Sequence, residues 1–178
     1  MSSLATLLPA CIDARASLLD EKHLSGCRLF NGFVEGLPTL ALDLYGTTLV
    51  IHDHSSAKTG DEALAKEALE LTKQKLPFIT TALWKVRSSD NTELRNGVML
   101  LGEEKQLCRR IVEDGVSYAL ALRLNRDASL YLDVAARDDR RVRIDLAHVV
   151  REVAEVVVRE LARQATHRTF DVDVIVRV

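Results

Sequence analysis

The sequence predicts an α+β fold, in which two or three helices pack on a small mixed or antiparallel sheet. Segments 40–45 and 48–53 are two apolar strand patterns on either side of a glycine turn. A strongly amphipathic helix follows at 62–73, and strand-like residues return over 78–87. With 178 residues, 47% of them hydrophobic and 28% charged, the chain can bury a core of this kind.

The N-terminal residues predict the first helix. Apolar residues recur at helical spacing from Ile12 to Leu19, which favours a helix over 10–23. That helix should end before the Ser25-Gly26 turn. We therefore expect an N-terminal helical segment over residues 1–27.

A β-hairpin is expected next, followed by a long helix. Leu40, Leu42 and Leu44 share one face of the first strand, and Gly46 supplies the turn into the second strand. In the helix, Asp61 occupies an N-cap position ahead of strong helix formers. We expect Pro77 to end this helix, and its apolar face should consist of the following residues: Leu64, Ala68 and Leu71.

The later elements divide the chain by composition. Nine of the seventeen arginines, but no lysine, lie in the last 45 residues. We therefore predict an α+β domain over 28–139 and a divergent helix-strand extension over 140–178. The later predicted elements are a hairpin turning at Glu113-Asp114-Gly115, a strand at 130–134, a helix at 144–163 and a strand at 169–178.

Charge and cysteine content exclude several classes of protein. The formal net charge of −2 gives no overall attraction for nucleic acid, so any RNA contact would be local and weak in the isolated chain. Three cysteines without close spacing indicate neither a disulfide framework nor a zinc site. The sequence has no apolar run long enough for a membrane span and no signal-peptide pattern, so we expect a cytoplasmic protein without membrane contact.

Two ordered groups of motifs carry a family resemblance. Arg28 leads a strand, Glu35-Gly-Leu-Pro forms a turn, and Asp43-x-Tyr-Gly lies in the hairpin, while 113–118 and 125–133 form a second group. The chain thus resembles the region that precedes the catalytic domain in S-adenosylmethionine (SAM)-dependent ribosomal RNA methyltransferases of the large-subunit cytosine-C5 type. This resemblance implies a small α+β accessory domain on the RNA side of such an enzyme.

The sequence lacks what the methyl-donor domain of that family needs. No glycine follows Gly115, although the first turn of a donor domain is glycine-rich, and only 39 residues (178 minus 139) follow Asp139. None of the three cysteines stands beside a proline, the usual context of the attacking thiolate. We therefore expect no complete Rossmann-like methyltransferase domain, no catalytic residue and no cofactor in this chain, although full-length relatives use SAM.

The resemblance also implies candidate contact residues. The candidates on the RNA or substrate side are Arg28, Asn31, Glu35, Asp43 and Tyr45. From the residues alone, the alternative for Asp43 is a carboxylate on the solvent face, and the alternative for Arg28 with Glu35 is a surface ion pair. The candidates facing a donor domain are Arg126, Ser129, Tyr131 and Asp133, and packing is the alternative role for Tyr131 and Asp133. His52 and His54 share a strand face, but without a cysteine nearby we predict no metal site.

These features lead to two hypotheses about function. In the first, the chain is a methyltransferase-family protein that retains only the accessory domain, binds RNA or a separate catalytic domain, and is inactive alone. A truncated or frame-altered end of the parent gene is one explanation for residues 140–178. In the second, the chain is a structural module that associates with itself or a partner through its sheet edge or its terminal strand.

Overall fold

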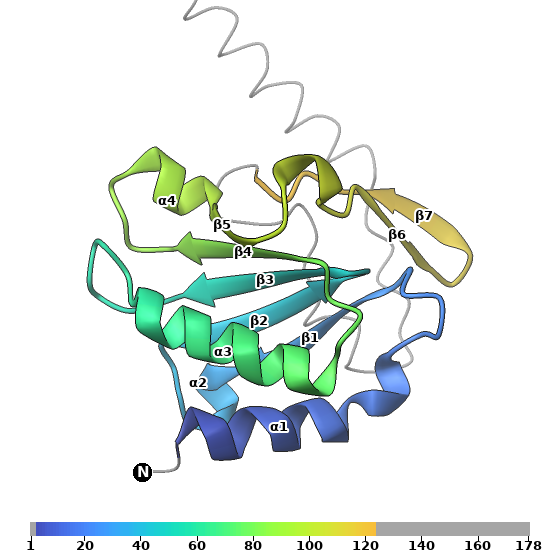
Figure 1. The fold of residues 1–178 in the computed structure, drawn as a ribbon, viewed down its shortest axis with the longest axis horizontal. Coiled ribbons are helices and arrows are strands. Elements are labelled where there is room, and N and C mark those ends of the chain that lie inside the picture. The colour runs from blue at the N-terminus through green and yellow to red at the C-terminus, as the bar shows by residue number, and fades with distance from the viewer. Residues whose placement is uncertain (1–2, 124–178) are drawn as a thin grey trace, which may run out of the picture. The chain divides into compact units, whose positions relative to one another are not determined.

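A computed structural model describes residues 3–123, and Figure 1 shows their arrangement. Five strands form one sheet in the order β1-β2-β3-β4-β5. All neighbouring strands are antiparallel except β3 and β4, which are parallel and are connected through α3. The strands are β1 (Gly26–Asn31), β2 (Leu40–Tyr45), β3 (Thr48–Asp53), β4 (Thr81–Val86) and β5 (Val98–Leu101). The predicted α+β class and the mixed sheet are confirmed.

Two long helices cover one face of this sheet. The helices α1 (Leu4–Ala14) and α3 (Glu62–Lys75) lie side by side in Figure 1 and contact each other. Their apolar side chains share one core with those of the inner strands. Members of this core from the strands include Leu40, Leu42, Leu44, Leu49, Ile51 and Trp84. In the described residues, the parallel pair β3-β4 is the only parallel pair, so a doubly wound sheet is not formed there.

The first helix begins earlier than its sequence pattern predicts. We expect a helix over 10–23, but α1 ends at Ala14, and a single 3₁₀ turn follows at Ala16–Leu18. The predicted start follows Pro9, which usually marks a helix boundary, whereas the structure places Pro9 inside the helix. Leu4 and Leu8 are buried, and this tertiary packing outweighs the backbone hydrogen bond that Pro9 cannot donate.

The long helix starts as predicted and has a slightly rotated buried face. The Asp61 side chain accepts a hydrogen bond from the backbone N–H of Leu64 at 3.0 Å, so it is the N-cap. The helix ends at Lys75, two residues before Pro77. Its buried residues are Ala65, Ala68, Leu69 and Thr72, while Leu64 and Leu71 are half-buried at the border of the core.

A separate hairpin follows the sheet. Strands β6 (Arg110–Glu113) and β7 (Val116–Ala119) pair antiparallel around Asp114 and Gly115, which both have positive φ, as a type I′ turn requires. The predicted hairpin is confirmed.

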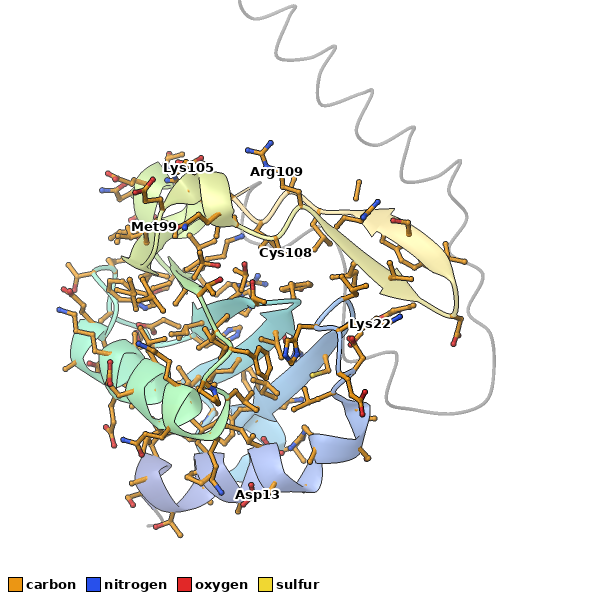
Figure 2. All side chains as sticks on the ribbon, turned by 45° about the vertical axis from the view of Figure 1, so that its right-hand side comes forward. Asp13, Lys22, Met99, Lys105, Cys108 and Arg109 are labelled. Atoms are coloured by element: carbon orange, nitrogen blue, oxygen red, sulfur yellow. The ribbon has the colours of Figure 1, made fainter. Side chains whose placement is uncertain are left out.

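Figure 2 shows Met99 and Cys108 beyond β4, remote from Asp13 on α1. The short helices and 3₁₀ turns are α2 (Gly32–Glu35), α4 (Thr92–Asn96), η1 (Ala16–Leu18) and η2 (Glu104–Gln106).

Several predictions concern residues beyond the described range. The strand at 130–134, the helix at 144–163, the strand at 169–178 and the extension 140–178 lie outside it. Within residues 3–123, none of the helices has the length and apolar character needed to cross a membrane.

Candidate functional site

The face of the sheet opposite α1 and α3 carries a row of charged side chains. Because Leu42 and Leu44 face the helices, the alternation of β2 turns Asp43 to the other face. Arg28 on β1 pairs in register with Asp43, and His52 on β3 pairs in register with Lys85 on β4. Four neighbouring strands thus each contribute one ionisable residue to this face.

Three of these residues, Arg28, Asp43 and His52, form what we call the ionic cluster. Arg28 donates from Nε to Asp43 Oδ1 at 2.7 Å and from Nη2 to Oδ2 at 3.0 Å. His52 Nε2 lies 3.1 Å from the same Oδ2. An ionised carboxylate only accepts hydrogen bonds, so His52 carries its proton on Nε2. Asp43 is 2% exposed, and both its oxygens have donors.

These contacts determine the charge state of Asp43. Burial raises the pKa of its carboxyl group, but the hydrogen bonds from His52 and Arg28 and the electrostatic attraction of these two residues outweigh burial and hold the pKa below its usual range. Asp43 is therefore an anion at neutral pH. Removing either donor would leave a buried charge with fewer partners, which is costly.

The second ring nitrogen of His52 limits what the cluster can do chemically. His52 Nδ1 is buried and accepts or donates no hydrogen bond within the described part of the chain. An aspartate-histidine pair activates a nucleophile only when a hydroxyl or thiol is bonded to the free nitrogen. No such group is bonded to His52 between residues 3 and 123, so the ionic cluster is not a hydrolytic triad there.

His54 lies at the end of β3, beside the ionic cluster. Its half-buried ring has a pKa lowered to about 4, first by burial and then by the positive charges of His52, Arg87 and Arg28. Its edge meets the ring of Phe33 on α2, with ring centroids 5.1 Å apart and planes at 74°. The strand ends thus combine basic side chains with an aromatic ring.

Two predictions about the candidate residues are wrong. The solvent-face position of Asp43 is wrong, because the second face of the sheet is also covered: Tyr45 and Val50 pack there in a core with Ile111 and Leu122. The ion pair between Arg28 and Glu35 is also wrong. Arg28 bonds Asp43, whereas Glu35 bonds a residue on the first helix.

The other candidates have structural environments of different kinds. Glu35 accepts hydrogen bonds from Arg15 Nη2 at 2.5 Å and from the backbone N–H of Asn31 at 2.6 Å, so it fixes the turn after β1. The Asn31 residue is half-buried, and Tyr45 is fully buried in the second core. The donor-facing candidates Arg126, Ser129, Tyr131 and Asp133 lie outside the described residues.

The contact between His52 and Asp43 is not among the predictions from the sequence, although hairpin register contains the signal for it. Tyr45 pairs with Thr48 across the turn, which places Asp43 opposite Val50 and Ala41 opposite His52. Asp43 and His52 are therefore diagonal neighbours on one face, within reach of long side chains. Among the described residues, no three metal-ligating side chains lie close enough together to hold a metal ion. His52 and His54 therefore belong to no such group.

Two of the cysteines, Cys27 and Cys11, do not have the environment of an activated thiol. Burial, followed by the negative charge of Asp43, raises the pKa of Cys27 to about 12. Burial, followed by a hydrogen bond to Glu35, also raises the pKa of Cys11. Both side chains are therefore thiols at neutral pH, whereas nucleophilic attack needs the thiolate.

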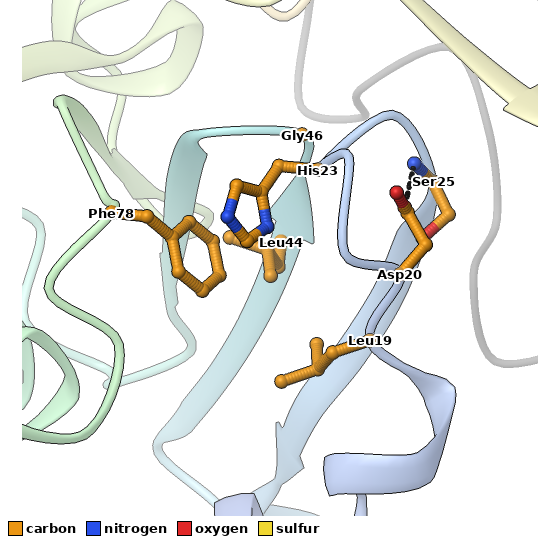
Figure 3. Close-up of a pocket in the computed structure, with 7 residues that line it drawn as sticks. All are labelled: Leu19, Asp20, His23, Ser25, Leu44, Gly46 and Phe78. Carbon is orange, nitrogen blue, oxygen red and sulfur yellow. Dashed lines mark hydrogen bonds between the residues drawn. The ribbon is translucent and has the colours of Figure 1, made fainter.

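A small pocket near the start of β1 is too small for an organic ligand. Figure 3 shows its lining, in which the His23 and Phe78 rings stack with centroids 3.6 Å apart. Its volume of about 10 Å³ suits one water molecule.

Burial raises the pKa of the nearby Asp20, but hydrogen bonds from Ser25 and Leu24 lower it to about 2. This carboxylate therefore stabilises the local turn by accepting hydrogen bonds from its backbone.

The connection from β3 to α3 does not fit the methyl donor SAM. In a donor domain, glycines after a strand let the cofactor approach the backbone. Here a Cβ on Gly60 would lie 2.5 Å from Trp84 and 2.8 Å from Asp53 Oδ2, so this glycine makes room for the protein's own side chains. The Asp61 carboxylate already occupies the N-terminus of α3. The described residues therefore form no SAM site at this crossover.

Comparisons with known proteins identify the fold. No protein-family model matches the chain, and no curated protein matches it. Two solved structures, both described as "putative" methyltransferases, share its fold. The first, SAM-dependent and from Streptococcus mutans, is 22% identical with a TM-score of 0.57, and the match covers 73% of this chain and 32% of that chain. The second, SMU.776 complexed with SAH, is 20% identical with a TM-score of 0.56 and the same coverage of 73% and 32%.

These matches establish a partial methyltransferase-related fold. The chain spans about a third of the length of the two proteins it resembles. The likeness agrees with the methyltransferase part of the resemblance found in the motifs of the sequence.

Proposed function

We propose that this chain supplies the RNA-side accessory domain of a SAM-dependent ribosomal RNA methyltransferase of the cytosine-C5 type, and that it does not transfer methyl groups alone. The observation that carries the proposal is the basic character of the strand ends. Arg28, His52 and Arg87 lower the pKa of His54 electrostatically and Asp53 raises it, while Arg28 is also paired with the Asp43 carboxylate. A surface of this kind attracts phosphates locally, although the whole chain is slightly acidic.

RNA retention on filters tests this proposal. We expect the chain to retain a ribosomal RNA fragment at about 50 mM salt and much less at about 200 mM, because each phosphate contact releases counterions. Arg87→Gln should lower both the affinity and the salt dependence. The matched control is Lys66→Gln on α3, an exposed lysine paired with Glu62 on the opposite side of the sheet. Equal retention at both salt concentrations, or none, would remove the RNA proposal.

A titration with labelled SAM tests the second part. The proposal expects no saturable binding, because the β3-α3 connection is filled by Trp84 and closed by Asp61. Saturable binding in the low micromolar range would overturn the claim that another polypeptide segment must supply the donor site.

Self-association through the sheet edge is the second candidate function, and β5 favours it. This edge strand is uncharged and apolar, and all four of its residues are half-exposed. Uncharged edge strands pair readily with other strands. Sedimentation should show a dimer that Val98→Lys dissociates, whereas a monomer at all concentrations would exclude this function.

A further inference from the structure

We propose that Phe33 and His54 form a stacking site for one unpaired nucleobase, so that the RNA taken up by this domain is single-stranded. This inference rests on the proposed RNA binding and specifies the class of RNA. It assigns a role to Phe33, which the motifs of the sequence did not single out.

The first observation is the exposure of α2. Phe33 is 64% exposed and its neighbour Val34 is 71% exposed, although both are apolar. A large aromatic ring left in water at the end of a sheet indicates a surface that another molecule covers.

The second observation is that the backbone beneath Phe33 is tightly held. A Cβ on Gly32 would lie 1.8 Å from the Leu37 carbonyl oxygen, so the turn is packed directly on backbone. The Leu37 N–H donates to Gly32 O at 2.9 Å, which closes the short helix. Glu35 is fixed at the same time by Arg15 and by the Asn31 N–H. Phe33 therefore projects from a pre-organised support, and little conformational entropy is lost when a ligand stacks on it.

The third observation is what lies beside the ring. The ring centroids of His54 and Phe33 lie 5.1 Å apart, and the ring planes meet at 74° in an edge contact. Two arginines act electrostatically on His54: Arg28, which is paired with the Asp43 carboxylate and is 21% exposed, and the half-buried Arg87. Aromatic rings next to basic side chains are the usual elements of single-strand binding, in which bases stack and cations accompany the phosphates.

This arrangement selects unpaired bases. In an RNA duplex the base faces are stacked on one another, so a protein ring can reach them only in single-stranded loops, bulges and ends. A single exposed phenyl ring accommodates one base, and stacking on it tolerates any base because each has a π face.

A fluorescent base analogue tests the site. A single-stranded RNA oligonucleotide carrying 2-aminopurine should be quenched on binding, and the same sequence as a duplex should bind more weakly. Phe33→Leu keeps an apolar side chain but loses the ring, and should weaken single-strand binding roughly 5- to 100-fold. Phe33→Trp should retain binding and quenching. The matched control is Leu18→Met, which alters an exposed apolar side chain on η1 outside the proposed site and should leave affinity unchanged.

The outcomes separate this inference from the proposed function. If the unmodified chain binds RNA with salt dependence but Phe33→Leu binds equally well, the stacking site is overturned while the RNA-binding proposal stands. The surface formed by Phe33 and Val34 would then be a contact surface for a protein partner. Duplex binding as strong as single-strand binding overturns the inference in the same way. If the unmodified chain binds no RNA at either salt concentration, the proposed function fails and the stacking site with it.

Discussion

The two faces of the sheet differ in what holds them together. Strand β2 is buried at all of its positions, yet Leu40, Leu42 and Leu44 meet helices whereas Asp43 meets two basic side chains. Apolar packing is non-directional and tolerates changes of shape at roughly constant volume. A buried ion pair depends on particular atoms at particular distances. The helix-covered face should therefore accept isosteric changes that the ionic face rejects.

The largest expected effect is that of Asp43→Asn, which keeps the shape and removes the charge. Arg28 and His52 would then face an amide instead of a carboxylate, and we expect a loss of about 3–5 kcal/mol in the free energy of unfolding. Urea denaturation of the full chain measures it. Asp13→Asn, which alters an exposed pair with Lys75, is the control and should cost less than about 1 kcal/mol. A loss at Asp43 no greater than this control would mean that the ionic cluster contributes no more than a surface pair.

The neighbouring residue provides the contrasting measurement. Leu42→Met preserves volume on the face covered by α1 and α3, and we expect it to cost less than about 1.5 kcal/mol. The same urea titration applies, and the slope of the transition should stay unchanged. If Leu42→Met costs as much as Asp43→Asn, the two faces do not differ in tolerance.

The contrast between the faces also explains what sequence patterns could predict. The hairpin, the turn at Gly46 and the start of α3 at Asp61 depend on neighbours in the chain, and all three are confirmed. The cover of the second face includes Ile111 and Leu122, which pack with Tyr45 and Val50 but are far away in sequence. Alternation along a strand distinguishes its two faces, but it does not reveal whether the second face is covered.

The candidate site was predictable to a similar extent. The motifs single out Arg28 and Asp43, which the structure brings together in the ionic cluster, and hairpin register could have added His52. The pairing of Glu35 with Arg15 requires α1 to pack near α2, which no local pattern contains. Phe33 has no periodicity that distinguishes it from a core aromatic residue, and only the structure reveals its exposure.

A smaller effect tests α3, one of the two helices that cover the apolar face of the sheet. Asp61→Ala removes the N-cap of α3 and leaves the Leu64 N–H without its side-chain acceptor. We expect a cost of about 1 kcal/mol, typical of a lost cap. Asp61→Asn, which also accepts from this N–H, should recover most of the stability in the same denaturation experiment. Equal losses in both variants would show that the cap hydrogen bond is not the cause.

A pH dependence is expected from His54, which lies beside the ionic cluster. The pKa of His54 is about 4 in the folded chain against an ordinary value of 6.5. Between these values the unfolded chain binds more protons, so stability is fully present above pH 6.5 and falls as the pH is lowered toward 4. Asp43, whose pKa is lowered, contributes its own loss only below its ordinary value of 3.8.

One other group acts in the same pH range and has to be separated from His54. The pKa of Glu113 is raised by burial and then by the negative charge of Asp114, so its contribution to stability has the opposite sign just above pH 4.5. Comparing the chain with His54→Asn at pH 7 and pH 5 cancels Glu113, since both proteins contain it. We expect the unmodified chain to lose more stability than the variant on this change of pH. Identical losses would mean that burial, together with the positive charge around His54, does not hold this ring neutral in the folded chain.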